Sequence, residues 1–186
     1  MTATHTPEQV AARRRSILDA ARWCFLNFGF AKTSFDDIAK RAGISRTLLY
    51  RVFKDKEQIF IAVFTDWLVS RHPAARSAAS GPDAQLSRLM DVCRLMVLEP
   101  WEEMLGAPMA GEFFDVCERL DPEVDALHRA VAHECVTTVL GDAAAAEVFL
   151  LALDGLLADQ PTTEVLEQRV QILAKRFVST ARNKKP

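Results

Sequence analysis

The sequence predicts an all-α protein of about nine helices, with an N-terminal three-helix domain over residues 1–55 and a C-terminal helical domain over residues 56–186. Three observations predict this class. Apolar residues recur at spacings of three and four along most of the chain, which is the period of a helix. Glycine and proline fall between the apolar stretches, where helices begin or end. Two short apolar stripes on either side of Gly43 have the layout of a helix-turn-helix.

The composition fits a folded protein with a sizeable core. The 186 residues are 49% hydrophobic, enough for one domain or two small ones. No apolar run approaches the roughly 18 residues of a membrane span, and no apolar signal segment follows the basic residues 13–15. We therefore expect a cytoplasmic protein without a membrane partner. Because the four cysteines lack CxxC spacing, we expect reduced, mostly packed thiols and no disulfide framework. No cofactor is expected.

The net charge of −2 conceals an uneven distribution along the chain. Residues 1–60 contain 11 Lys and Arg against 6 Asp and Glu, a net of +5, whereas residues 61–186 have a net of −7. Neutralisation of phosphate charge dominates non-specific binding to nucleic acid. Electrostatic attraction would therefore orient the basic N-terminal third, and not the acidic remainder of the chain, toward DNA. Chance unevenness of solvated charge is the alternative explanation.

Capping signals bound the first two helices. The first helix begins near Pro7, carries apolar residues through Phe28 and ends at Gly29, where a left-handed cap fits. The second runs from about Phe35 to Ala42, and Ser34 is its expected N-cap. The long apolar face of the first helix is expected to support the unit that follows.

Residues 38–53 point to function more than any other stretch, because they form a helix-turn-helix pattern. Gly43 supplies the permissive backbone that a tight turn needs, and Ser45 can cap the next helix through its hydroxyl. One face of that helix is apolar and is expected to pack, with Leu48, Leu49, Val52 and Phe53. The opposite face can touch DNA and consists of Arg46, Thr47, Tyr50, Arg51 and Lys54.

Helix signals continue after this motif. Asp55 is the expected N-cap of a fourth helix with a broad apolar face. A loop is expected near residues 73–82, followed by a helix over residues 84–98 that Pro100 stops or kinks. After a short irregular helical region, Pro122 marks the start of another helix.

The last two helices differ from the others. Residues 143–159 are apolar nearly all round, which predicts burial on two sides, and the last helix, capped by Thr162 or Thr163, has one apolar stripe. Two adjacent helices of this kind suit a four-helix bundle formed with a second copy of the chain, the alternative being an ordinary monomer core. The expected homodimer interface consists of Val148, Leu151, Ala152, Gly155, Val170, Leu173 and Phe177.

A set of spaced residues in the first third matches one known pattern. These residues are Gly29-Phe30, Thr33-Ser34, Ile38-Ala39, Ala42-Gly43-Ile44-Ser45, Leu49-Tyr50, Phe53 and Lys56. In them the chain resembles the TetR family of bacterial transcriptional regulators over about residues 12–64, and beyond that it is similar in length, helical pattern and residues 153–156. The resemblance implies a regulator, not an enzyme, that binds a palindromic double-stranded DNA operator as a homodimer. It further implies a repressor that a small-molecule effector releases.

The resemblance also implies which side chains meet DNA. Arg46 and Thr47 would face base edges, Tyr50 would touch the backbone or a thymine, and Lys56 would meet a phosphate. Arg46 is the leading base reader, because a guanidinium can bond the O6 and N7 atoms of guanine. The expected DNA contacts are Thr33, Ser34, Ser45, Arg46, Thr47, Tyr50, Arg51, Lys54 and Lys56.

Two departures from the family pattern narrow this expectation. Where many members have Gly then Thr after the basic residue, this chain has Thr47 then Leu48. Where a His or Tyr often follows, it has Val52. If Leu48 and Val52 join the packed face, fewer side chains reach DNA, and the operator sequence of relatives should not be transferred.

The effector is unknown from the sequence. Adaptable sulfur and aromatic side chains in the middle third suit an apolar effector, and ordinary core packing is the alternative. The expected pocket residues are Phe64, Met90, Met96, Trp101, Met104, Met109, Phe113 and Phe114.

Two rival interpretations have their own tests. A DNA-binding regulator without an effector would keep its operator affinity across a broad set of compounds. A metal-dependent enzyme or metal sensor would use His128, His133 and Cys135, although an i, i+5 histidine pair does not share a helix face. No metal site is expected.

Overall fold

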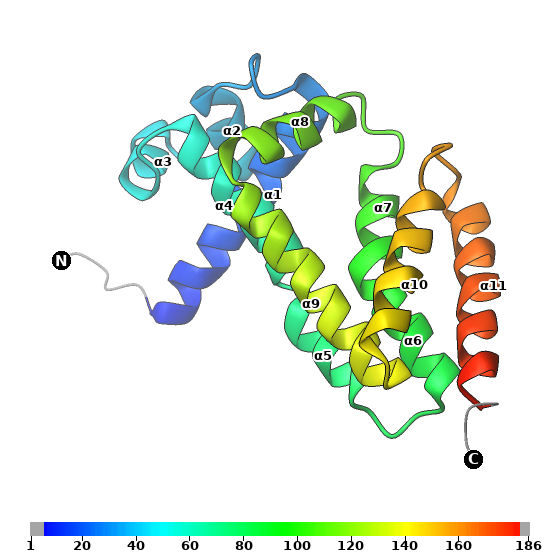
Figure 1. Ribbon diagram of the computed structural model, residues 1–186. Helices are drawn as coiled ribbons and strands as arrows, with labels where there is room; N and C mark the ends of the chain where they lie inside the picture. The colour runs from blue at the N-terminus through cyan, green and yellow to red at the C-terminus, as the bar shows by residue number, and fades with distance from the viewer. Residues whose placement is uncertain (1–5, 183–186) are drawn as a thin grey trace. The chain divides into compact units, whose positions relative to one another are not determined.

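The computed structural model describes residues 6–182, with the backbone alone at 114, 118 and 179–182. It confirms the all-α class, since the described residues form helices and connecting turns without a strand. Within them, eleven α-helices and one π turn follow each other (Figure 1). The bounds are α1 Pro7–Phe28, α2 Phe35–Ala42, α3 Arg46–Val52, α4 Lys56–Val69, α5 His72–Ala79, α6 Gln85–Cys93, η1 Arg94–Leu98, α7 Glu99–Met104, α8 Ala110–Leu120, α9 Pro122–Leu140, α10 Ala143–Gly155 and α11 Thr163–Arg182.

The described residues divide into two compact units. Unit 1 comprises Met1–Trp67 and Gly106–Pro122, and unit 2 comprises Leu68–Leu105 and Glu123–Pro186. Unit 1 therefore holds α1 to α3, most of α4, and α8, which comes from the middle of the chain. A division at residue 55 into a DNA-binding and an effector-binding domain remains a prediction about function.

Reciprocal capping explains where α1 and α2 begin. The Thr6 hydroxyl accepts a hydrogen bond from the Gln9 backbone N–H at 3.3 Å, and the Gln9 side chain accepts one from the Thr6 N–H at 3.1 Å. Ser34 and Asp37 make the same pair of contacts at α2. Hydrogen bonds from the Ser34 hydroxyl and backbone lower the pKa of Asp37, so the capping carboxylate stays charged. Each pair supplies acceptors for N–H groups that have no hydrogen-bond partner within the first turn of a helix.

Aromatic rings hold unit 1 together. Phe25 of α1, Phe60 of α4 and Phe113 of α8 are buried. The Phe60 ring centroid lies 5.0 Å from that of Phe25 and 4.9 Å from that of Phe113. The Met109 N–H donates to the Leu26 carbonyl at 2.9 Å and ties the start of α8 to the end of α1. α8 thus belongs to the scaffold that positions α1 and α4.

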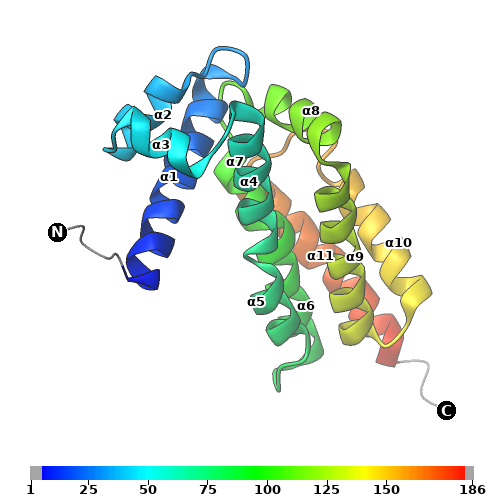
Figure 2. The same cartoon turned by 90° about the vertical axis from the view of Figure 1, so that its left-hand side faces the viewer.

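Unit 2 has its own apolar core, to which α5, α6, α9, α10 and α11 contribute. Leu89 of α6, Phe149 of α10 and Leu166 of α11 are fully buried in it. α6 packs against both α5 and α11, and α10 lies beside α11 (Figures 1 and 2). Among the described helices, none combines the length and the apolar character needed to cross a membrane.

The expected loop at residues 73–82 is mostly helix, so that prediction is wrong. α5 spans His72–Ala79, and a turn follows it. Pro73 lies in the first turn of α5, where a missing N–H leaves no hydrogen bond unmade. Alanine has the highest helix propensity, and Ala75 and Ala79 are buried in the core of unit 2. Propensity and burial together outweigh the small, loop-like composition of this segment.

Pro100 marks an irregularity rather than an end. α6, η1 and α7 follow without a break, and Pro100 lies in the first turn of α7. Proline has no N–H to donate to the carbonyl four residues earlier, which is that of Met96. His128 Nε2 of α9 lies 3.1 Å from the Met96 carbonyl oxygen and supplies the missing donor.

That contact sets the proton positions in a pair of histidines, of which His72 is buried and His128 is half-buried. Because His128 Nε2 donates to the Met96 carbonyl, its Nδ1 is an acceptor, and His72 Nε2 donates to it across 3.1 Å. Burial lowers the pKa of both imidazoles, and the positive charge of Arg76 further lowers the pKa of His72. Both shifts favour the neutral imidazoles, and the pair joins α5 to α9 within unit 2.

Candidate nucleic-acid interface

The helix-turn-helix expected from residues 38–53 is present in unit 1. Gly43 joins α2 to α3 in a left-handed conformation, with φ 66° and ψ 30°, which glycine adopts without strain. Ser45 caps α3, and its hydroxyl accepts from the Leu48 N–H at 3.2 Å. Leu49 and Phe53 are buried, so α3 is anchored by its inner face.

The outer face of α3 carries an ordered polar array. One guanidinium nitrogen of Arg46 donates to the Tyr50 hydroxyl at 3.2 Å, and this contact raises the pKa of Arg46. The Tyr50 ring stacks on Phe35 of α2, with centroids 4.4 Å apart and planes at 16°. Tyr50 is nevertheless 48% exposed. The stacked ring therefore holds Tyr50 and Arg46 in place while both face outward, a role for Phe35 that the sequence did not suggest.

Only part of the predicted apolar stripe on α3 packs. Leu48 is half-buried, whereas Val52 is 37% exposed. The expectation that Val52 packs is therefore wrong, because the short helix turns this position toward solvent. The exposed polar side chains of α3 are Arg46, Thr47, Tyr50 and Arg51.

Three of the hydroxyl residues expected at the interface, Thr33, Ser34 and Ser45, have structural partners. Thr33 is only 2% exposed, and its hydroxyl donates to the Gly29 carbonyl at 2.7 Å. The Ser34 hydroxyl donates to Asp37 at 2.6 Å, and the Ser45 hydroxyl caps α3. Ser34 and Ser45 are exposed, but Thr33 lies below the surface. Its burial leaves Thr33 poorly placed for a DNA contact.

The basic residues from Arg51 at the end of α3 to Lys56 at the start of α4 differ in their hydrogen-bond partners. Lys56 Nζ donates to the carbonyls of Phe30 at 2.6 Å and Ala31 at 3.2 Å, and lies 4.6 Å from the Phe30 ring centroid. This ammonium group ties the start of α4 to the segment between α1 and α2. Arg51 and Lys54 are exposed. A phosphate contact by Lys56 would have to use its remaining N–H.

Two further cations, absent from the sequence prediction, lie over aromatic rings. The Arg14 guanidinium carbon is 5.0 Å from the ring centroid of Phe53, at the end of α3. That of Arg41 is 3.4 Å from the ring centroid of Trp23. The basic run at residues 13–15 was the available sequence signal, although nothing local in the sequence pairs these arginines with their rings.

The residues expected to line an effector pocket belong to both units. They are Phe64, Met109 and Phe113 in unit 1, and Met90, Met96, Trp101 and Met104 in unit 2. In unit 2, the Trp101 indole N–H donates to the Pro161 carbonyl at 2.9 Å. The side chain of Phe114 lies outside the described residues. An effector pocket built from these residues remains a prediction.

The outward surface of α10 includes exposed apolar residues. Val148 and Leu151 are 57% and 65% exposed, and Gly155 lies on the surface one turn further on. Ala152 is half-buried. With exposed Ala144, the exposed residues Val148, Leu151 and Gly155 form an uncharged strip at helical spacing, flanked by exposed Glu147 and Asp154.

The residues expected at the interface from α11 lie on its inner side. Val170 is fully buried, and Leu173 and Phe177 pack against the core of unit 2. Val165 and Ile172 are the exposed apolar residues of this helix instead. The single stripe seen in the sequence is thus mainly core, so Val170 has no surface to offer a second copy.

The rival metal site does not assemble. His128 is committed to His72 and to the Met96 carbonyl, and His133 is half-buried elsewhere on α9. Cys135 is buried, which raises the pKa of its thiol. Among the described residues, no three His, Cys, Asp or Glu side chains are grouped so that they could hold a metal ion.

Sequence comparisons place the first third of the chain among known regulators. Residues 17–63 match the family model of bacterial regulatory proteins of the tetR family. Over 90 residues the chain is 39% identical to the HTH-type transcriptional repressor KstR2 of Mycolicibacterium smegmatis, covering 47% of this chain and 44% of that protein. Over 93 residues it is 34% identical to an HTH-type transcriptional repressor of Mycobacterium tuberculosis, covering 50% and 45%. The matched part is less than half the length of either relative.

Solved structures share the fold over nearly the whole chain. A TetR-family transcriptional regulator from Streptomyces coelicolor superposes with a TM-score of 0.65 at 21% identity, covering 92% of this chain and 96% of that one. SmeT, the repressor of the Stenotrophomonas maltophilia multidrug efflux pump SmeDEF, has a TM-score of 0.63 at 19% identity, covering 90% and 89%. A SmeT–triclosan complex has a TM-score of 0.61 at 19% identity, covering 91% of each chain. Residues 17–63 thus match the tetR family of bacterial regulatory proteins, and the solved structures share the fold of nearly the whole chain.

Proposed function

We propose that the protein is a DNA-binding transcriptional repressor that acts on a palindromic operator as a homodimer and is released by a small-molecule effector. The observation that carries the proposal is the outer face of α3. A helix capped at Ser45 and anchored by Leu49 presents Arg46, Thr47 and Tyr50 to solvent. This is the arrangement that places a recognition helix in the major groove.

The side chains on this face suit direct reading of bases. An Arg46 guanidinium that bonds guanine O6 and N7 contributes about 1–3 kcal/mol of discrimination. Thr47 adds a methyl group and a hydroxyl, and Tyr50 adds a phenol supported by Phe35. The net charge of +5 over residues 1–60 favours the phosphate backbone irrespective of sequence.

A second copy is proposed to cover α10 and α11. Val148 and Leu151 on α10, with Val165 and Ile172 on α11, leave apolar surface on two adjacent helices of unit 2. Two such pairs form a four-helix bundle under twofold symmetry. A twofold dimer has two reading heads, which must match half-sites about 34 Å apart or a multiple of that distance. This proposal replaces Val170 with Ile172 at the interface.

Release by an effector is supported by a structural relative and by composition. SmeT is a repressor that binds triclosan, as its complex shows. The middle third of this chain is rich in methionine and aromatic residues, which adapt to apolar ligands. A ligand regulates only if it binds the DNA-competent and DNA-incompetent arrangements with different affinity. We also propose a cytoplasmic location, because a repressor must reach its operator DNA.

Selection of bound sequences from random duplex DNA tests the proposal. We expect enrichment of an inverted repeat whose half-sites are separated by about one helical turn or a multiple of it. A single unrepeated site would contradict the dimer, and no enrichment over the starting pool would contradict sequence-specific binding. The selected duplex then serves to screen apolar compounds for loss of binding.

A further inference from the structure

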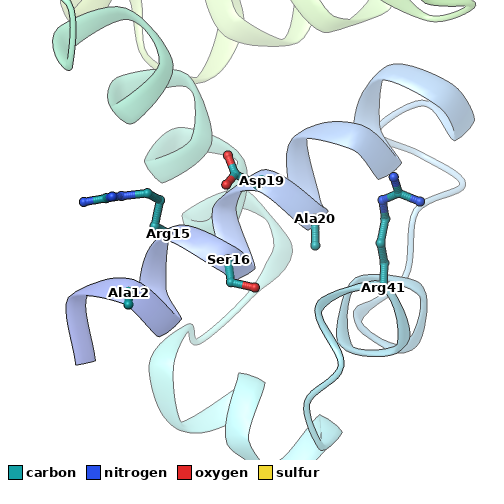
Figure 3. A pocket seen from close by; sticks show the side chains of 6 residues that line it. All are labelled: Ala12, Arg15, Ser16, Asp19, Ala20 and Arg41. Atoms are coloured by element: carbon teal, nitrogen blue, oxygen red, sulfur yellow. The ribbon is translucent and has the colours of Figure 1, made fainter. Parts of the chain in front are cut away.

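Unit 1 carries two groups of charged side chains that differ in whether the side chains meet. An open hollow on α1 and α2 is lined by Arg15 and Arg41, among others. These two arginines rise from its opposite ends and point in different directions, so they do not converge on one ligand (Figure 3). On the outer face of α3, by contrast, Arg46 and Tyr50 contact each other, and Phe35 of α2 contacts Tyr50.

The three side chains contact each other in series. Phe35 is the first residue of α2 and is half-buried, whereas Tyr50 and Arg46 are exposed. The Phe35 and Tyr50 rings are stacked, with centroids 4.4 Å apart and planes at 16°. Arg46 lies one helical turn before Tyr50, so the two share a face of α3. Its guanidinium donates to the Tyr50 hydroxyl at 3.2 Å, and its guanidinium carbon lies 5.5 Å from the Tyr50 ring centroid.

These contacts order Arg46 before it meets DNA. An exposed arginine has many rotamers, and fixing one of them costs part of the free energy of binding. Contacts that already exist in the free protein reduce this cost and also fix the direction of the guanidinium. Tyr50 uses one of the five N–H donors of Arg46, which leaves four, and guanine O6 and N7 need two. The held guanidinium can therefore still bind a base.

We propose that Phe35 is a positioning residue for sequence recognition, which acts through Tyr50 to hold Arg46 in the orientation that reads a guanine. The inference rests on the proposed function and deepens it, because it assigns part of the specificity to an apolar residue of α2. A ring that only stabilised the fold would affect binding to all duplexes alike. A ring that orients Arg46 affects the preference at the one base position that Arg46 reads.

The experiment repeats the selection from random duplex DNA with variants of the full chain. Arg46→Ala identifies the position that Arg46 reads, because the preference is lost there. Phe35→Leu keeps an apolar side chain and removes the ring. It should weaken the preference at that same position by about 2- to 10-fold and leave the other positions unchanged. Phe35→Tyr keeps a ring for the stack and should retain the preference.

A matched control and a double variant sharpen the test. Phe28→Leu removes an exposed phenylalanine of α1 that contacts Trp23 edge-on, and it should leave every position unchanged. If Phe35 acts through Arg46, Phe35→Leu should have little effect on discrimination once Arg46→Ala is present. Equal effects of Phe35→Leu with and without Arg46 would contradict the inference.

The outcomes separate this inference from the proposed function. If the wild type enriches no sequence, the proposed function fails. If the wild type enriches an inverted repeat but Phe35→Leu keeps the full preference, or weakens all positions alike, the positioning role is wrong and the proposed function stands.

Thermal unfolding shows whether Phe35→Leu remains folded. Should it unfold, Tyr50→Phe decides, since this variant keeps a ring beside Phe35 and removes the hydroxyl that accepts from Arg46. It should weaken the preference at the position that Arg46 reads. An unchanged preference at that position would overturn the inference.

Discussion

The outer faces of α3 and α10 are both exposed, but they differ in chemistry. On α3 the exposed side chains are polar and bond to each other, as Arg46 does to Tyr50. On α10 they include the apolar side chains of Val148 and Leu151, which no other described residue covers, with exposed Glu147 and Asp154 beside them. A polar face is stable in water by itself, whereas a contiguous apolar face indicates a protein partner. The same exposure therefore indicates a nucleic-acid surface on α3 and a protein surface on α10.

The two faces also differ in how much free energy they can supply. Burial of one leucine side chain contributes about 1.5–3 kcal/mol, and a twofold interface buries every residue twice. A bidentate contact to a base contributes about 1–3 kcal/mol, and it does so as discrimination between sequences. We therefore expect α10 to determine whether the dimer forms, and α3 to determine which sequence it binds.

The largest expected effect comes from Leu151→Asp, which breaks the apolar face of α10. Because Leu151 is 65% exposed in the chain, the variant should fold normally. The dimer should weaken by about 4 kcal/mol, or roughly 1,000-fold, because two leucine side chains are no longer buried. Sedimentation at a series of protein concentrations measures this change. Leu127→Asp, at an exposed leucine of α9, is the control and should remain dimeric. A dimeric Leu151→Asp would place the interface elsewhere.

The second prediction concerns the polar face. Arg46→Ala should weaken binding to the selected operator by about 10- to 100-fold, the equivalent of 1–3 kcal/mol. Binding to random DNA should fall far less, because the substitution removes a reader of bases and leaves the phosphate-binding side chains in place. Competition between the two duplexes measures the ratio.

Arg51→Ala is the matched control for Arg46→Ala, since both arginines are exposed on α3. It should lower both affinities alike, as expected for a phosphate contact. Equal reductions on operator and random DNA for Arg46→Ala would remove this residue from the set of base readers.

Elements with local signals were predictable from the sequence. Ser34 and Ser45 cap α2 and α3 as expected, and Gly43 adopts the left-handed turn between them. These signals depend on residues three or four positions apart, so the sequence contains all of the relevant chemistry.

Features that depend on distant contacts were not predictable. α8 joins unit 1 although it comes from the middle of the chain. Val170 is core and Ile172 is exposed, and only the position of neighbouring helices decides which side of α11 is inner. The same holds for Lys56, whose ammonium group bonds carbonyls about 25 residues away. The spacing of apolar residues in the sequence locates an apolar stripe on a helix, but it does not show which part of the structure packs against that stripe.

A smaller effect is expected when the pH is lowered. Mild acid should reduce the stability of unit 2, which carries α10, and not that of unit 1, which carries α3. In unit 2 His72 is buried and His128 is half-buried, and desolvation lowers the pKa of both. The unfolded chain therefore takes up protons first. The free energy of unfolding should be constant at high pH and should fall as pH drops through the unfolded value of about 6.5.

Denaturant midpoints at about pH 7.5 and pH 5.5 measure this change. The double variant His72→Gln/His128→Gln keeps polar groups at both positions without a titrating imidazole, so its midpoint should change less. An equal acid shift in the wild type and the double variant would assign the effect to other groups.

The smallest expected effect tests whether Thr33 belongs to the DNA surface. Its hydroxyl donates to the Gly29 carbonyl, and the residue is buried. Thr33→Val should lower the free energy of unfolding by about 1 kcal/mol, because it removes that hydrogen bond. Operator affinity should not change, because a side chain below the surface reaches no phosphate. Thr33→Ser restores the hydroxyl and should recover most of the stability. If Thr33→Val instead weakened operator binding at unchanged stability, the hydroxyl would have to rotate outward, and the polar face would extend from α3 to the start of α2.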